Sequence, residues 1–131
     1  MKIVRPNYDD CITNLSNSIL AYFGCKTFNK TLPDIDEILK ENNSKNVVVL
    51  LLDGMGINIL ERTLSDSSFL RKNLLRAFHS IFPPTTVAAT TSLMSGLNPC
   101  QHGLLGWDLY FCKENKTVTV FKNTIKDSNV P

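Results

Sequence analysis

The chain has 131 residues, 43% hydrophobic and 20% charged, a balance typical of one soluble globular domain and not of a coiled coil or a disordered tail. Its 14 Lys and Arg against 12 Asp and Glu leave a net charge of +2 with both signs dispersed, so we expect no nucleic-acid platform. The longest apolar run, residues 47–52, is far shorter than the roughly 18 residues of a membrane-spanning helix. No secretory signal pattern follows the first residues, which favours a cytoplasmic protein.

The first third of the chain is predicted to be helical. Apolar side chains recur at helical spacing between residues 12 and 22, after an Asp that can act as N-cap and before Gly24 as a stop signal. A second helix is expected from Pro33, because proline suits the first turn and the acidic residues that follow it suit a helix N-terminus.

Two strands and a crossover are predicted next. Residues 46–52 form a β-branched and leucine-rich run without alternation, which is typical of a strand buried on both faces. Helices are expected at about 57–64 and 69–74, and a second strand at about 76–81. Strand, helix and strand predict a right-handed parallel crossover, and therefore an α/β fold with a mainly parallel sheet flanked by helices. An exposed edge of this sheet would allow a homo-oligomer.

The remainder alternates between breakers and regular elements. The prolines in residues 82–84 favour extended chain, and residues 86–95 then form a compact helical stretch that Gly96 closes. Residues 107–121 predict a β-hairpin. The tail from residue 123 to residue 131 has no periodicity and is predicted to be irregular.

Asp53 is the first candidate for chemistry. It follows the strand predicted at 46–52, at the carboxyl end where open α/β sheets bind ligands. Gly54 and Gly56 would let the backbone turn tightly beside a metal, and a carboxylate is a suitable hard oxygen ligand for a divalent cation. The alternative is that Asp53 only caps the following helix.

Thr85 and Thr86 are the second candidates. They open a helix after an extended Pro-Pro segment, so a hydroxyl lies beside free N–H groups at a positive helix end, an arrangement that binds phosphate. The alternative is an ordinary threonine N-cap. Consecutive parallel strands would bring Asp53 to the same sheet edge as Thr86, where one cation could bridge the two side chains.

Three segments together resemble the type I phosphodiesterase/nucleotide pyrophosphatase branch of the alkaline phosphatase superfamily: Val47 to Gly56, Phe82 to Thr86, and Ser92 to Gly103. The resemblance implies a partial alkaline-phosphatase-like sandwich with a C-terminal hairpin. Residues 1–131 would then be the N-terminal part of one catalytic domain. Its helical lead-in would be 1–45, its core motif region 46–107, and its hairpin and tail 108–131.

The resemblance also implies roles for single residues. Asp53 corresponds to a metal ligand and Thr86 to a metal-bound covalent nucleophile, while Thr85 and Thr86 would contact the phosphate. The family's cofactors are two divalent metal ions, identified as Zn²⁺, and the substrate would be a phosphodiester or a phosphorylated small molecule. His102 and Gly103 match a recurring pair that we interpret as structural. The family's further Asp and His ligands do not occur after Trp107, so we expect the isolated chain to be inactive.

Two alternatives stay open at this point. One is a noncatalytic short α/β module that binds a phosphorylated ligand or a protein partner. The other is a member of the same superfamily similar to the cofactor-independent phosphoglycerate mutases, which share the strand-Asp-Gly start. Those enzymes use a serine nucleophile, and the Phe-Pro-Pro-Thr-Thr sequence at residues 82–86 argues against them.

Overall fold

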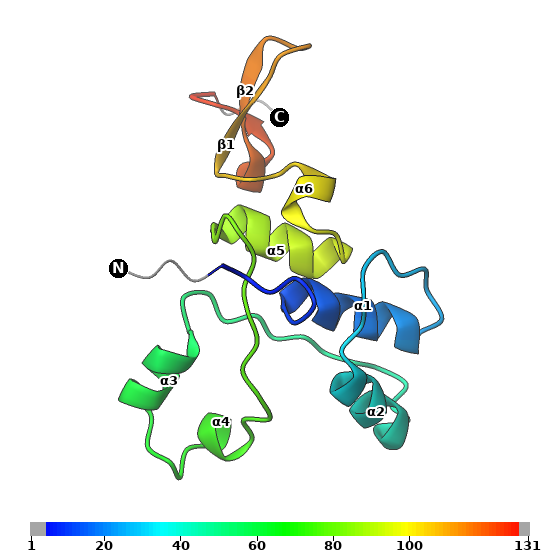
Figure 1. Ribbon diagram of the computed structural model, residues 1–131. Coiled ribbons are helices and arrows are strands. Elements are labelled where there is room, and N and C mark those ends of the chain that lie inside the picture. The colour runs from blue at the N-terminus through cyan, green and yellow to red at the C-terminus, as the bar shows by residue number, and fades with distance from the viewer. Residues whose placement is uncertain (1–4, 129–131) are drawn as a thin grey trace.

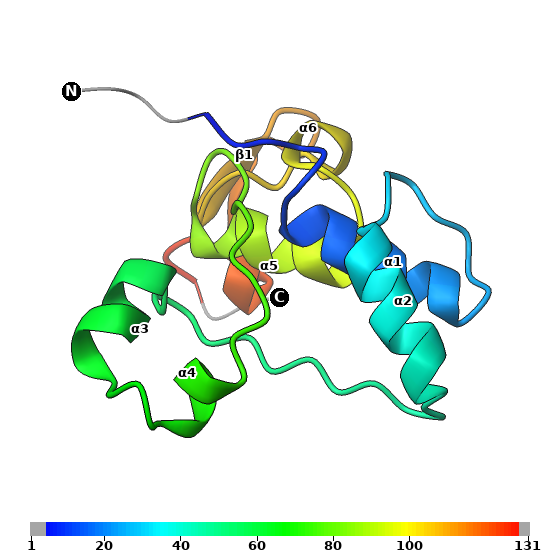
Figure 2. The same ribbon diagram turned by 60° about the horizontal axis from the view of Figure 1, so that its bottom comes forward.

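The computed structural model describes residues 5–128 and combines helices with one small sheet (Figure 1). The helices are α1 Ile12–Tyr22, α2 Pro33–Asn42, α3 Ile57–Thr63, α4 Phe69–Lys72, α5 Thr86–Ser95 and α6 Pro99–His102. The strands are β1 Asp108–Phe111, β2 Lys116–Thr119 and β3 Thr124–Ile125, with a 3₁₀ turn η1 at Val120–Lys122. Helix α1 packs on both α2 and α5. Helices α3 and α4 lie apart from that group (Figures 1 and 2).

The five helices expected from the sequence are confirmed, with ends that differ by a few residues. Helix α6 lies in a segment that the sequence presented as turns. Pro99 at its first position and a capping box between Asn98 and Gln101 explain why four residues become helical there. The predicted hairpin is confirmed as β1 and β2, and the tail expected to be irregular contributes β3.

The mainly parallel sheet is not supported by the structure. The described residues contain one sheet, in the order β1-β2-β3, and both of its pairings are antiparallel. Residues 46–52 and 76–81, predicted as strands, are extended chain without a ladder, and the isolated bridge from Cys11 to His79 is the one parallel pairing within residues 5–128. A strand requires hydrogen bonds to a neighbour, and apolar sequence favours the extended backbone without supplying that neighbour.

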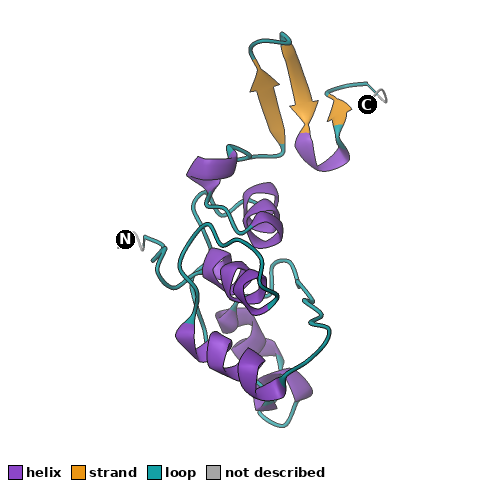
Figure 3. Ribbon diagram, turned by 90° about the vertical axis from the view of Figure 1, so that its right-hand side faces the viewer, coloured by secondary structure: helices purple, strands orange, loops and turns teal. Residues whose placement is uncertain are grey.

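The sheet lies at one end of the molecule, beyond α6 (Figure 3). Polar side chains fix its register, because the Thr119 hydroxyl donates to Asp108 Oδ1 at 2.7 Å and Lys126 pairs with Asp108 Oδ2 at 3.0 Å. On the flanks of the hairpin, the rings of Trp107 and Phe121 stack with centroids 5.3 Å apart. The hairpin therefore carries its own local contacts.

Helix α1 buries its polar face. The apolar side chains that predicted an amphipathic helix, such as Leu15 and Ile19, are only half-buried. The fully or nearly fully buried positions are Thr13, Asn14, Ser16, Asn17 and Ser18. Burying a polar group without a hydrogen bond is costly, and every one of these side chains except the Thr13 hydroxyl has a partner.

Asn17 supplies the most complete of these matches. Its Nδ2 donates to the carbonyls of Thr13 and Gly96, both at 2.8 Å, and its Oδ1 accepts from the N–H groups of Phe28 and Asn29 at 2.8 and 3.1 Å. All four hydrogen-bonding positions of the amide are thus used. One buried side chain thereby joins α1, the loop before α2 and the end of α5.

Gly96 accommodates this contact because it has no side chain. It ends α5 with φ +72°, a left-handed conformation that favours glycine. A Cβ at this position would lie 3.2 Å from Asn17 Nδ2 and 3.0 Å from Leu20 Cδ1. The Gly96 carbonyl also accepts from Asn29 Nδ2 at 2.8 Å, which extends the network towards α6.

The extended segment before α5 is anchored at the start of α1. Arg76 pairs with Asp34 at 2.9 Å and also with Asp10. The His79 N–H donates to the Asp10 carbonyl and the His79 carbonyl accepts from the Ile12 N–H, both at 3.0 Å. These contacts hold residues 76–81 beside α1 and so fix the direction in which the chain enters α5.

Replacing Asn17 tests the polar interface. We expect Asn17→Ala to lower the free energy of unfolding by at least about 2 kcal/mol, because it leaves several buried backbone groups without partners. Urea denaturation followed by circular dichroism measures the change. Asn58→Ala, at an exposed position of α3, is the control and should stay within about 0.5 kcal/mol of the wild type. Equal midpoints for the two variants would contradict the role given to Asn17.

Candidate functional site

The structure brings Asp53 and Thr86 together. The Thr86 hydroxyl donates a hydrogen bond to Asp53 Oδ2 at 3.4 Å, across 33 positions of sequence. Thr86 is the first residue of α5, and Asp53 lies in the turn after the extended residues 47–52. The contact is exposed, so a ligand can reach both oxygens from solvent.

The turn at Asp53 follows from its neighbours in sequence. Gly54 has φ +70°, a value that favours glycine, and lets the chain reverse directly after the carboxylate. Asp53 does not cap the next helix, because the N-cap of α3 is Gly56 and no side chain caps it. The capping interpretation of Asp53 is therefore wrong, and its carboxylate is directed to Thr86 instead.

Thr85 occupies the N-cap position of α5. Its hydroxyl oxygen accepts from the Ala88 N–H at 3.3 Å, and the hydroxyl donates to the Leu105 carbonyl at 2.8 Å. The capping interpretation is thus confirmed for Thr85, whose single hydroxyl proton is already used. Thr86 is the threonine of this pair whose hydroxyl meets a carboxylate.

The end of α5 adds a favourable electrostatic environment for an anion. The N–H groups of Thr86 and Val87 belong to the first turn, where no intrahelical acceptor exists. The aligned peptide dipoles place partial positive charge at this end, and α5 itself contains no charged residue. A phosphoryl group beside Thr86 would meet these N–H groups.

Two oxygen donors fit part of a metal site. The Asp53 carboxylate and the Thr86 hydroxyl are hard ligands 3.4 Å apart, a separation that suits two positions around one divalent cation. Catalytic zinc normally has about three protein ligands. Within residues 5–128 no cluster of three or more His, Cys, Asp or Glu side chains is present. The described residues therefore supply a pair of ligands.

A second polar cluster lies between α5 and α6. His102 Nε2 is 3.0 Å from the Ser92 hydroxyl oxygen, and the Leu104 N–H donates to His102 Nδ1 at 3.0 Å. Burial lowers the pKa of His102 below its ordinary 6.5, and a hydrogen bond to the Ala88 carbonyl offsets part of this effect. Sequence reasoning did not find the Ser92–His102 contact or the Leu105 carbonyl beneath Thr85, because neither spacing follows a helical or strand period.

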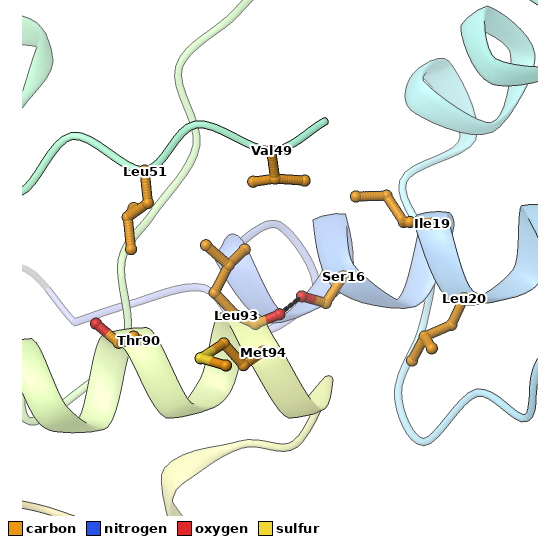
Figure 4. A pocket seen from close by; sticks show the side chains of 8 residues that line it. All are labelled: Ser16, Ile19, Leu20, Val49, Leu51, Thr90, Leu93 and Met94. Carbon is orange, nitrogen blue, oxygen red and sulfur yellow. Dashed lines mark hydrogen bonds between the residues drawn. The ribbon is translucent and has the colours of Figure 1, made fainter. Parts of the chain in front are cut away.

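An apolar groove separates α1 and α5 from the extended chain (Figure 4). Val49 and Leu51 point from residues 47–52 towards Ile19 and Leu93, around a cavity of about 370 Å³. Asp53 and Thr86 do not line it, and its lining residues carry no ionisable group. The groove is therefore a packing surface beside the candidate site.

The comparisons with known proteins identify the class of protein. The family model described as type I phosphodiesterase / nucleotide pyrophosphatase matches residues 47–130, which include both Asp53 and Thr86. The chain belongs to this family, whose members are hydrolases of the phosphodiesterase and pyrophosphatase type. Searches of curated proteins and of solved structures found no match. None of the helices within residues 5–128 is long and apolar enough to cross a membrane.

The free energy of unfolding of two alanine variants tests the different roles of Thr85 and Thr86. We expect Thr85→Ala to lower the free energy of unfolding by about 1 kcal/mol, because α5 loses its N-cap and the Leu105 carbonyl loses its donor. Thr86→Ala is the matched variant and should change it by less than about 0.5 kcal/mol, because the hydroxyl is exposed and makes one long contact. Thermal denaturation of both proteins measures the difference, and a larger loss for Thr86→Ala would reverse the assignment.

Proposed function

We propose that this chain carries the nucleophile of a metal-dependent phosphodiesterase or nucleotide pyrophosphatase, with Thr86 as the attacking group and Asp53 as a metal ligand. The observation that carries the proposal is the hydrogen bond between the Thr86 hydroxyl and the Asp53 carboxylate at the N-terminus of α5. The family match covers both residues. The substrate class is a phosphodiester or a related phosphorylated small molecule.

The proposed reaction has two displacements. Thr86 Oγ1 attacks the phosphorus atom and forms a phosphothreonine that still carries the second ester group of a diester substrate. The bond from phosphorus to the leaving alcohol or phosphate breaks, and the leaving group takes up the proton that the Thr86 hydroxyl loses. Water then attacks the phosphothreonine, which restores the Thr86 hydroxyl and releases the phosphorylated product. The Asp53 carboxylate orients the Thr86 hydroxyl before attack. The first N–H groups of α5 face the charge that develops on the phosphoryl oxygens.

Two divalent cations, proposed as Zn²⁺, belong to this mechanism. Asp53 and Thr86 would contribute one ligand each, and a bound cation makes a hydroxyl more nucleophilic and stabilises charge on phosphoryl oxygens. With a pair of ligands from the described residues, we expect the 131-residue chain by itself to hold zinc weakly and to be inactive. Activity requires the remaining ligands.

We also propose that residues 47–52 and 76–81 become strands of a parallel sheet in the catalytically competent protein, which we place in the cytoplasm. Residues 1–131 then form the N-terminal part of one catalytic domain. Support comes from side-chain direction: Val49 and Leu51 already face α1 and α5 as a strand faces a helix layer (Figure 4). Val48 and Leu50, between them, are 90% and 79% exposed. Such a segment pairs readily with another strand.

An assay of the native polypeptide tests the nucleophile. We expect the protein isolated from its source cells, with its intact mass measured, to hydrolyse bis(p-nitrophenyl) phosphate in the presence of Zn²⁺. Thr86→Ala should lower kcat by about a thousandfold or more, because the covalent intermediate cannot form. Mass spectrometry of the quenched wild-type reaction should find a p-nitrophenyl phosphoryl group on Thr86.

The controls separate loss of chemistry from loss of fold. Thr91→Ala changes another threonine of α5 and should retain wild-type turnover. Calorimetric titration with Zn²⁺ should show weaker binding for Asp53→Ala than for the exposed control Glu114→Ala. Unchanged turnover in Thr86→Ala would overturn the assignment, and binding of phosphate esters without turnover would favour a noncatalytic phosphate-binding module.

The exposed strand segment predicts self-association of the isolated chain. We expect light scattering after gel filtration to detect dimers or larger species at micromolar concentration, because residues 47–52 offer apolar side chains and free backbone groups to a second copy. Leu50→Lys should shift the protein towards monomer, because a charge opposes edge pairing. Phe69→Lys, at another exposed apolar position, is the control and should leave the distribution unchanged. A monomeric wild type would contradict the prediction.

A further inference from the structure

We propose that His102 is a positioning residue for the nucleophile: it holds the turn whose Leu105 carbonyl engages Thr85, and so leaves Thr86 as the reactive threonine. This inference rests on the proposed function and adds a residue to it. His102 lies at the end of α6, behind α5, and touches neither Asp53 nor Thr86 through any hydrogen bond within residues 5–128. Its effect must therefore pass through the turn.

The hydrogen bonds define the form of the imidazole. The Leu104 N–H is a donor, so the Nδ1 that it contacts at 3.0 Å must carry a lone pair. In the neutral ring the proton then lies on Nε2, where the Ser92 hydroxyl at 3.0 Å and the Ala88 carbonyl can accept it. One neutral ring in one tautomer thus connects the turn after α6 to a fully buried serine of α5.

The turn after α6 connects the His102 ring to the start of α5. The Leu104 N–H donates to the His102 ring, and the carbonyl of the following residue, Leu105, accepts a hydrogen bond from the Thr85 hydroxyl at 2.8 Å. The same Thr85 oxygen accepts the Ala88 N–H and completes the N-cap. Thr85 and the Ser92 contact of His102 therefore attach the turn to α5 at points about two helical turns apart. With Thr85 held in this way, the hydroxyl available to Asp53 is that of Thr86.

The surroundings of His102 oppose its protonation. Helix α5 and residues 103–106 contain no ionisable side chain, and α6 adds only the exposed Cys100. Protonation would place a hydrogen on Nδ1 facing the Leu104 N–H, so an attractive contact would become a contact between two donors. The turn would then lose its attachment to His102, and the Thr85 hydroxyl alone would hold the Leu105 carbonyl to α5.

Stability should fall as the pH is lowered through the titration of His102. The folded protein favours the neutral ring, so the unfolded chain binds more protons near the His102 pKa. The contribution of His102 to stability is complete above about pH 6.5 and is lost as the pH falls below that value. Turnover in the native polypeptide should decline in the same window, because the turn releases Thr85.

Three substitutions test whether His102 acts through its hydrogen-bond acceptor and its protonation. His102→Asn keeps an acceptor near the Nδ1 position and cannot be protonated, so it should retain the turn and remove the acidic decline of kcat. His102→Ala removes the acceptor and should lower kcat by about tenfold or more with little change in KM, because the nucleophile is misplaced and substrate binding is not altered. His79→Gln changes the other histidine of the chain and should keep the wild-type pH profile.

Nuclear magnetic resonance tests the contacts without turnover. In the 131-residue chain, the amide signals of Leu104 and Ala88 should shift together with the His102 ring between pH 7 and pH 5, with a midpoint below 6.5. A His102 titration midpoint at or above 6.5 would overturn the inference. An Ala88 amide signal that does not shift with the His102 titration would overturn it as well. So would an acidic decline that persists in His102→Asn. Failure of the proposed function has a different signature, namely unchanged turnover in Thr86→Ala.

Discussion

The amide of Asn17 is the contact on which the rest of the structure depends. It joins α1 to the Gly96 carbonyl at the end of α5 and to two N–H groups of the loop that leads to α2. Because the amide is fully buried, each of its four hydrogen bonds must be made or a desolvation cost remains. That requirement fixes the distance and rotation of α5 against α1. It thereby places the opposite end of α5, where Thr86 begins the helix.

A polar interface of this kind leaves apolar surface elsewhere. The accessible surface is 9598 Å², against about 6,900 Å² for a typical compact monomer of 14.7 kDa. Large apolar side chains contribute to this surface, as in the exposed residues 48–52 and in Met94 of α5. The half-buried side of α1 and the facing side of α5 enclose the groove that Val49 and Leu51 enter.

The candidate site depends on contacts that are distant in sequence. Thr85 and Thr86 are adjacent and chemically identical, yet one is a helix cap and the other meets Asp53. The difference arises from the Leu105 carbonyl, which lies 20 positions further along the chain and accepts a hydrogen bond from the Thr85 hydroxyl. His102 holds that turn from behind α5. Which threonine hydroxyl meets Asp53 therefore depends on the turn after α6 as well as on the helix that carries the threonines.

The sequence by itself determined the local elements and the candidate residues. Helical periodicity, proline and glycine signals located α1 to α5 and the hairpin, and the strand-like run ending at Asp53 together with the threonines after Pro84 marked the site. Only the tertiary structure decided which face of α1 is buried, which threonine is the cap, and that residues 46–52 stay unpaired among the described residues. The physical reason is that periodicity reports local backbone preference, whereas hydrogen-bond partners such as Gly96 and Leu105 come from distant parts of the chain.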